Sequence, residues 1–336
     1  MIERIPQRPP VINPLPENEN RPLLSVMIPT YNCISYLRQT LESVLAQDWG
    51  EENMQIEVID DCSTDGDVEA LVKSVGKGRV GFFRQEKNGG SLRNFETCIQ
   101  RSRGVRLHIL HGDDQVKPGF YNEVDKLFAE HPAIGAAITG CVEMDEQGRE
   151  HYKYPHVIQT PGIVNDWLFR IAQRQLINPP AIVVKRSVYE TLGSFFAVHY
   201  GEDWEMWARI GTQYKVAYSP TYLALYRVHQ SNISSNAFAS GQNIRDINTV
   251  IDIIQSYLPE DQKQKLKHHA KHYYSTYFAK SASKLLSVQN KPAIALKQAR
   301  GALSMQVNKT TLTTFVKVHV KHFLHSMKKA SPASSS

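Results

Sequence analysis

Short apolar runs alternate with amphipathic segments along the chain up to about residue 140. Residues 24–28 form an apolar run that ends at Pro29, and residues 36–47 then place apolar side chains at helical spacing. Further strands are predicted at residues 56–59, 80–84 and 105–110, and further helices at residues 68–75, 92–99 and 118–130. Strands that alternate with helices in this way predict an α/β fold with a mostly parallel sheet flanked by helices.

The remainder of the chain reads as a mixed region followed by a helical one. A hairpin or loop is predicted at residues 144–161, helices at 163–174 and 202–211, and strands at 181–184, near Val216 and at 223–228. From Ala237 onward the pattern is almost wholly helical. We therefore predict a flexible Pro-rich leader over residues 1–22, an α/β domain over 23–236, a helical region over 237–329 and a disordered Ser-rich tail over 330–336.

Composition narrows the class of protein without naming a function. Apolar residues make up 41% and charged residues 21% of the 336 residues, which is ordinary for a soluble globular protein. The four cysteines form no C-x-x-C pair, so neither a zinc ribbon nor a disulfide framework is indicated. With no signal peptide and no apolar run near the roughly 20 residues of a membrane span, we predict a cytoplasmic protein, at most peripheral at the inner face of a membrane.

Polar clusters follow three of the predicted strands where each strand ends. They occupy residues 29–32, residues 60–65 and the pair Asp113 and Asp114. In an open parallel sheet, ligands bind outside the carboxyl ends of the strands, so we expect these clusters to share one site. Adjacent carboxylates are costly to keep charged unless a cation lies between them and an anionic ligand. A divalent metal on a diphosphate meets that requirement, because Mg²⁺ and Mn²⁺ prefer oxygen ligands.

The same three clusters carry a resemblance to a known family. Residues 25–32 (SVMIPTYN), 58–66 (VIDDCSTDG) and 110–114 (LHGDD) together resemble family 2 of the inverting glycosyltransferases, which have the GT-A fold. The resemblance covers roughly residues 23–235. It implies nucleotide contacts from Pro29, Tyr31 and Asp61, and a D-x-D-type metal site at Asp113 and Asp114, with Asp114 as the direct ligand.

One position departs from the family pattern. His111 stands where the family often has Asp, which leaves Asp113 and Asp114 to carry the metal.

A second block, residues 201–207 (GEDWEMW), resembles the family's G-E-D-W-x-x-W segment, which supplies the catalytic base. The resemblance makes Asp203 the candidate base, because a direct displacement needs a base beside the acceptor hydroxyl. Glu202 remains an alternative base. Both carboxylates could instead merely favour the dipole at the start of a helix.

Two further segments carry weaker resemblances. Residues 226–229 (YRVH) resemble a late element of the family, which implies that Arg227 contacts phosphate and that His229 contacts the metal or a phosphate oxygen. A structural, hydrogen-bonded His229 is the alternative. Residues 88–94 (NGGSLRN) resemble a stretch beside the base, where Arg93 would touch the nucleotide, although a helix cap at Ser91 explains part of this motif.

The implied reaction is metal-assisted transfer of a sugar, with inversion, from a nucleoside-diphosphate donor to an acceptor hydroxyl. The expected cofactor is Mn²⁺ or Mg²⁺, the expected donor a UDP-sugar, and the acceptor a glycan or a lipid-linked molecule. The alternatives are a sugar nucleotidyltransferase, whose Gly-rich loop after the first strand is missing here, and a non-catalytic, degenerate transferase. No G-x-G-x-x-G opens the first helix, which excludes a nicotinamide oxidoreductase, and no motif predicts nucleic-acid binding.

The last predicted helix, residues 311–329, is basic and amphipathic. Its apolar side chains are Leu312, Phe315, Val316, Phe323 and Met327. Lysines line another side of the same helix. The apolar side either packs on the enzyme or rests on an anionic membrane.

Overall fold

The computed structural model describes residues 3–16, 20–229 and 232–330, with side chains described as far as His322. These residues form two compact units. The first comprises residues 3–168 and 175–229, and the second comprises residues 169–174 together with the described residues from 232 onward. The division after residue 229 falls ahead of Ala237, where the sequence predicts the boundary. The tail predicted at 330–336 lies, from residue 331, outside the described residues.

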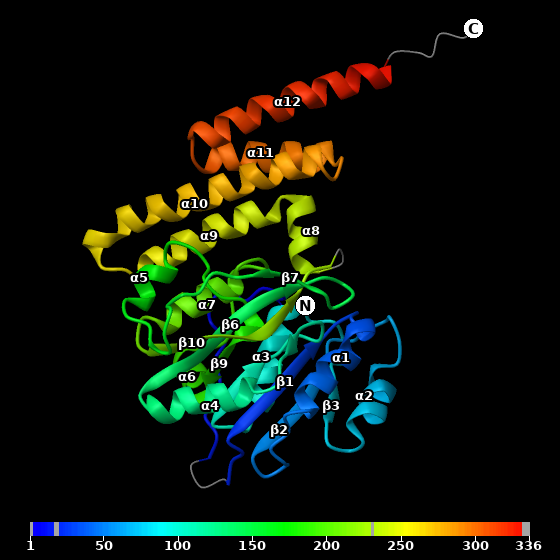
Figure 1. Cartoon of the computed structure of the whole chain (residues 1–336), viewed down its shortest axis with the longest axis vertical. Coiled ribbons are helices and arrows are strands. Elements are labelled where there is room, and N and C mark those ends of the chain that lie inside the picture. Colours follow the sequence, from blue (N-terminus) through cyan, green and yellow to red (C-terminus); the bar gives the residue numbers. More distant parts are fainter. Residues whose placement is uncertain (1–2, 17–19, 230–231, 331–336) are drawn as a thin grey trace. The chain divides into compact units, whose positions relative to one another are not determined.

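A single mixed sheet forms the centre of the first unit (Figure 1). Its strands are β1 (Leu24–Thr30), β2 (Met54–Asp60), β3 (Gly81–Arg84), β4 (Arg106–Ile109), β5 (Gln115–Val116), β6 (Ile134–Met144), β7 (Glu150–Lys153), β8 (Gly162–Ile163), β9 (Ile182–Lys185) and β10 (Lys215–Arg227). The strand order is β3-β2-β1-β4-β9-β6-β10-β5, with β7 paired to β6 and β8 paired to β10.

Helices flank this sheet and connect its strands. They are α1 (Ile34–Leu45), α2 (Val68–Gly76), α3 (Ser91–Arg101), α4 (Phe120–Glu130), α5 (Trp167–Ile171), the 3-10 helix η1 (Pro179–Ala181), α6 (Arg186–Leu192) and α7 (Glu202–Ile210). Helix α3 packs on β1, β2 and β4, and α4 packs on β6 and β10.

The parallel half of the sheet brings the polar clusters together. Strands β3, β2, β1 and β4 run parallel, with Thr30 opposite Asp60 and Met27 opposite Ile109. All seven residues of β1 are buried, as expected for a parallel strand covered on both faces. The carboxyl ends of β1, β2 and β4 therefore lie at one edge, where the sequence places its three clusters.

The second half of the sheet and its connections differ from the predicted pattern: α6 (Arg186–Leu192) was not predicted, and other elements have different bounds. Ile163 pairs with Ala217 as part of β8, so the helix predicted from residue 163 begins only at Trp167. The two strands predicted near Val216 and at residues 223–228 are one strand, β10, whose pairing to β6 shifts between Ser219 and Tyr222. Pro220 lies in this shift, and because proline has no N–H to donate it interrupts the ladder without ending the strand.

Residues 3–13, here called the N-terminal strap, differ from the flexible leader that the sequence predicts. The Ala197 amide donates to the Pro6 carbonyl and the Ser194 amide donates to the Pro10 carbonyl, each over 2.9 Å. Ile12 is 1% exposed. Prolines lack an N–H but keep a carbonyl acceptor, so a Pro-rich segment can bind a folded surface through its carbonyls without forming a helix or strand.

The second unit is helical. It contains α8 (Ile233–Ser240), α9 (Gln242–Ser256), α10 (Glu260–Ser287), α11 (Pro292–Met305) and α12 (Lys309–Ala330). Helices α10, α11 and α12 pack on one another around Ala282, Ala295, Ala299 and Val318, whose small side chains allow close approach. Among the described residues, no helix combines the length and the apolar character needed to cross a bilayer.

Candidate active site

Asp61 directly follows β2, and several hydrogen bonds converge on its carboxylate. It accepts hydrogen bonds from the Gly89 amide (2.7 Å), the Gly90 amide (2.8 Å) and the side-chain amide of Asn88 (2.9 Å). Burial raises the pKa of Asp61, and the bonds from Gly89 and Gly90, with the positive charge of Arg4, act in the opposite direction. The carboxylate is thus fixed in place but has little contact with solvent.

The loops after β1 and β2 are tied together beside Asp61. Asn32 has a left-handed backbone (φ 49°), its amide donates to the Ser63 hydroxyl, and its side-chain oxygen accepts from the Thr64 amide over 2.8 Å. Tyr31, one of the predicted nucleotide contacts, is 50% exposed on this loop. The carbonyl of Pro29 accepts from the Gly112 amide over 3.1 Å. This bond joins the β1 loop to residues 111–114, here called the acidic segment.

Arg93, also predicted to touch the nucleotide, faces the N-terminal strap. Its Nε donates to the Glu3 carbonyl over 2.8 Å, and Nη1 pairs with Glu96. The N-cap of α3 is Gly90, and no side chain caps this helix. Ser91 lies inside the helix, so the alternative in which Ser91 acts as a cap is incorrect.

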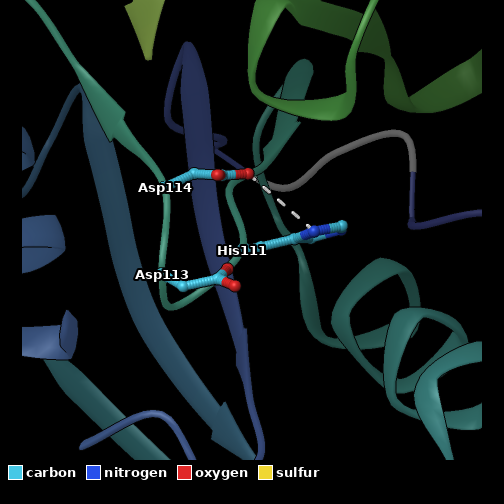
Figure 2. A group of neighbouring side chains, drawn as sticks. All are labelled: His111, Asp113 and Asp114. Carbon is cyan, nitrogen blue, oxygen red and sulfur yellow. Dashed lines mark ion pairs between the residues drawn. The ribbon is translucent and has the colours of Figure 1, made fainter. Parts of the chain in front are cut away.

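His111, Asp113 and Asp114 lie on the short segment after β4 (Figure 2). One ligand atom from each lies within 4.8 Å of the others, and the three side chains project to the same side of the segment. The loop approaches β1 and α1 closely at Gly112, where an added Cβ would lie 2.9 Å from both the Thr30 hydroxyl and the Cys33 sulfur. Glycine is therefore required there for the segment to adopt this path.

Asp114 is buried and only partly satisfied. Its Oδ1 accepts from the Arg227 amide over 2.9 Å, whereas Oδ2 has no hydrogen-bond partner among the described residues and lies 3.9 Å from His111 Nδ1. Burial, and then the charge of Asp113, raise the pKa of Asp114 well above its usual value. A buried carboxylate oxygen without a partner is costly, and a divalent cation at this oxygen would remove the cost. The donor set therefore fits Mn²⁺ or Mg²⁺.

His229 and Asp113 form the second contact of this group. His229 Nε2 lies 2.9 Å from Asp113 Oδ2, and the His229 ring packs against Tyr36 at a centroid distance of 4.9 Å. Burial alone would raise the pKa of Asp113, but the hydrogen bond from His229 and the charges of His111 and His229 bring it below its usual value. The structure thus brings His229 to the acidic pair, where either predicted role, metal contact or structural hydrogen bond, is sterically available.

Arg227 is 1% exposed and holds the acidic segment through hydrogen bonds to backbone carbonyls. Its Nε donates to the Asp113 carbonyl (2.8 Å), Nη1 to the Asp145 carbonyl (3.0 Å) and Nη2 to Gln39 (2.7 Å). The guanidinium also lies over the Tyr36 ring, 4.8 Å from its centroid. The predicted phosphate contact would require these bonds to be exchanged, so in this structure Arg227 positions the loop.

Asp203, the predicted base, lies in the first turn of α7, which begins after Gly201 in a left-handed conformation (φ 91°). Its Oδ1 accepts from the Trp204 amide over 2.7 Å, and Oδ2 accepts from the Gln175 side chain. Burial raises the pKa of Asp203 to about 6, with these two hydrogen bonds opposing the shift. A carboxylate with this pKa is charged at neutral pH but is a stronger base than an exposed aspartate.

A cavity lies between Asp203 and His111. His111, Glu202 and Asp203 line it, together with apolar side chains from α3, α6 and α7. His111 stacks on the Phe95 ring, with planes 4° apart and centroids 5.2 Å apart. Burial lowers the pKa of His111, which favours the neutral ring.

The model for glycosyl transferase family 2 matches residues 25–193, half of the chain. This protein belongs to glycosyltransferase family 2. The match ends before α7, so the Asp203 region lies outside it. An uncharacterized protein of Mycobacterium tuberculosis is 27% identical over 241 residues, covering 68% of this chain and 74% of that protein.

Two solved structures resemble this glycosyltransferase in fold. One is S. aureus TarS, residues 1–349, in complex with UDP-GlcNAc, with a TM-score of 0.62, 16% identity and coverage of 90% of this chain and 92% of TarS. The other is the mannosyltransferase PcManGT of Pyrobaculum calidifontis in complex with GDP-Man and Mn²⁺, with a TM-score of 0.54, 16% identity and coverage of 88% and 90%. The predicted GT-A fold is confirmed.

Two residues of this family 2 glycosyltransferase site were missed by the sequence analysis. Gln175 holds Asp203, and Arg4 reaches Asn88 over 2.6 Å. Both lie in polar stretches without hydrophobic periodicity, and each meets a partner far away in sequence. Only the Pro-rich composition around Arg4 marked its segment as unusual.

Proposed function

We propose that this glycosyltransferase transfers a sugar from a nucleoside-diphosphate donor to an acceptor hydroxyl in one inverting displacement. The observation that carries this proposal is the cavity lined by both His111, of the acidic segment, and Asp203, of α7. His111 groups with Asp113 and Asp114, the proposed metal ligands, so the proposed base lies across this cavity from the metal-binding segment. A direct displacement requires such an arrangement, because nucleophile and leaving group must lie on opposite sides of the sugar carbon.

Asp61, Tyr31 and Arg93 are proposed as the donor's nucleotide contacts, with the Pro29 backbone beside them. The complexes of TarS with UDP-GlcNAc and of PcManGT with GDP-Man support a nucleotide-sugar donor. We propose a UDP-sugar for this chain.

Asp114, Asp113 and His229 are the proposed holders of a divalent cation, Mn²⁺ or Mg²⁺. The Mn²⁺ in PcManGT supports this assignment, as does the unpartnered oxygen of Asp114. When bound, such a cation supplies a Lewis acid for charge on a diphosphate oxygen. Asp114 would present Oδ2 to it, while the Arg227 amide keeps Oδ1 in place.

Asp203 is the proposed base. Its carboxylate takes the proton of the acceptor hydroxyl while the acceptor oxygen bonds to the anomeric carbon. The bond from that carbon to the diphosphate breaks, and the nucleoside diphosphate leaves with the electron pair. Gln175 orients the carboxylate through its hydrogen bond to Oδ2.

Donor binding is the first test of this function. Titration with UDP-, GDP- and dTDP-sugars in the presence of Mn²⁺ is expected to raise the melting temperature for at least one donor, because ligands of the folded state stabilise it by mass action. That donor should also be hydrolysed slowly, as judged by release of the nucleoside diphosphate. No thermal shift with any donor would refute the proposal, and binding without turnover would favour the non-catalytic alternative.

We propose further that the acceptor is a glycan or lipid-linked molecule at the cytoplasmic face of a membrane, reached through α12. Helix α12 packs on α10 and α11 of the same unit. Its buried side chains Thr311, Thr314 and Val318 are at most 7% exposed. Leu312 and Val316, which the sequence analysis places on a possible packing side, are instead 50% and 53% exposed. The side chains of Phe323 and Met327 lie outside the described residues.

The exposed face of α12 has two adjacent rows. Leu312, Val316 and Val320 form an apolar row at a spacing of four residues, and Lys317 and Lys321 form a basic row beside it, also at a spacing of four. Every formally charged side chain after Asp261 is a Lys or Arg. Apolar side chains flanked by lysines suit the headgroup region of an anionic membrane, where each Lys contributes about 1 kcal/mol.

The double variant Lys317→Glu/Lys321→Glu tests this contact. We expect the wild-type protein to co-sediment with phosphatidylcholine vesicles containing phosphatidylglycerol, and not with phosphatidylcholine alone. The double variant should bind at least about tenfold more weakly, since two attractive charges become repulsive. Measurement is by vesicle co-sedimentation at low and high salt.

The control is Lys77→Glu/Lys215→Glu, which changes the net charge equally at exposed positions of the first unit. Equal loss of binding in both double variants would show a general charge effect and refute a role for α12. A dimer in light scattering that Val316→Asp dissolves would instead identify a second copy as the occupant of this face.

A further inference from the structure

The N-terminal strap reaches the base-binding part of the proposed donor site. Arg4 Nη2 donates to Asn88 Oδ1 over 2.6 Å, and Glu3 accepts from Arg93 through its carbonyl. An added Cβ on Gly90 would lie 3.3 Å from Arg4 Nε, so the guanidinium lies against this glycine. Asn88 and Gly90 are two of the three residues that hold the Asp61 carboxylate.

Arg4 has unused hydrogen-bonding capacity at this place. A guanidinium has five N–H donors. Among the described residues, the Arg4 side chain has one hydrogen-bond partner, Asn88, and it is exposed to solvent. The remaining donors are therefore available to a ligand beside Asp61.

Asp61, in contrast, has little acceptor capacity left. A carboxylate offers about four lone-pair positions. Gly89 takes one on Oδ1, and Asn88 and Gly90 take both on Oδ2. About one position on Oδ1 remains for a ligand N–H.

We propose that Arg4 determines base specificity by donating to a carbonyl oxygen of a base whose neighbouring N–H is accepted by Asp61. A subsite with several free donors and about one free acceptor suits a base with two carbonyl oxygens around a single N–H, which is the imide edge of uracil. Guanine suits it poorly, because its edge presents several N–H donors and one carbonyl oxygen, and unpaired N–H groups in a partly buried site are costly.

The same strap contacts the loop that leads to α7. Ser194, which donates to Pro10, also accepts through its carbonyl from Arg209 Nη2 over 2.9 Å, and Arg209 pairs with buried Glu205 on α7. An added Cβ on Gly193 would lie 2.7 Å from the Pro10 carbonyl oxygen, so the strap fits closely here. The strap is therefore attached at residues 3 and 4 to the start of α3 and at Pro6 and Pro10 to the loop before α7. These contacts hold Arg4 at the subsite, although the strap forms no helix or strand.

Isothermal titration of UDP and GDP with Mn²⁺ present tests the inference, which rests on the proposed donor site. Wild-type protein is expected to bind UDP more tightly than GDP. Arg4→Ala should raise the dissociation constant of UDP about tenfold and that of GDP by less than about threefold, because loss of a hydrogen bond to a charged donor affects the base that uses it. The melting temperature should not change, since Arg4 is exposed.

Arg8→Ala is the matched control. Arg8 lies on the same strap, is exposed and makes no hydrogen bond or ion pair with any described residue, so both affinities should stay at wild-type values. Unchanged UDP binding in Arg4→Ala would overturn the inference. An equal loss for UDP and GDP would overturn it too, because it would indicate attraction to the diphosphate. If wild-type protein bound GDP more tightly than UDP, this inference alone would fail, whereas no nucleotide binding at all would refute the proposed function.

Discussion

Asp114→Asn is expected to lower the transfer rate by about three orders of magnitude, with the fold intact. The amide oxygen of Asn can still accept from the Arg227 amide, so the loop keeps its support. The neutral side chain is a poor ligand for a divalent cation, and Lewis-acid stabilisation of a leaving diphosphate is worth several kcal/mol. Manganese binding in the presence of UDP, measured by electron paramagnetic resonance, should weaken in parallel.

The control for this variant is Asp166→Asn, which removes the same charge at an exposed position away from the acidic segment. It should retain wild-type activity and manganese affinity. If Asp114→Asn also retained both, the metal site would have to lie elsewhere, and the unpartnered Oδ2 would need another explanation.

Asp203→Asn is expected to lower kcat by about two to four orders of magnitude, the usual contribution of a general base. The amide oxygen of Asn can still accept from the Trp204 amide, and rotation of the Gln175 amide group would let its oxygen accept from the Asn NH2, so the active-site structure should survive. Donor and Mn²⁺ affinity should remain at wild-type values, because Asp203 is proposed to act on the acceptor. Glu202→Gln, measured alongside, should retain most of the activity.

The pH dependence of the wild-type enzyme gives a second readout of the same residue. Burial raises the pKa of Asp203 to about 6, and a base works only when deprotonated. The rate should therefore be constant above this pH and fall about tenfold per pH unit below it. Weakened donor binding in Asp203→Asn would place this residue in the nucleotide site, and loss of activity confined to Glu202→Gln would make Glu202 the base.

The sequence was sufficient to predict which polar clusters share one edge of the sheet. Short apolar strands alternating with helices predicted the parallel half of the sheet, and the end of a parallel strand is a position that can be read from the chain. The clusters that contain Tyr31, Asp61 and Asp114 therefore could be assigned to one edge before their contacts were known. The structure agrees, with Thr30 opposite Asp60 and Met27 opposite Ile109.

Contacts between distant segments could not be predicted in the same way. Arg227 carries the residue type expected for a phosphate ligand, but its donors are used by backbone carbonyls of loops more than 80 residues away in sequence. Gln175 and Arg4 lie in polar stretches where no periodicity fixes a direction. In such positions the three-dimensional packing decides the partner, and local sequence contains no signal for it.

The position of the strap affects how donor preference can change among related enzymes. The family match begins at residue 25, whereas Arg4 lies on a segment that precedes it and is attached to the fold mainly through backbone carbonyls and Ile12. Attachment of this kind places few demands on side-chain identity. A substitution at residue 4 would therefore leave every shared motif intact, so enzymes with identical motifs can differ in the nucleotide they select.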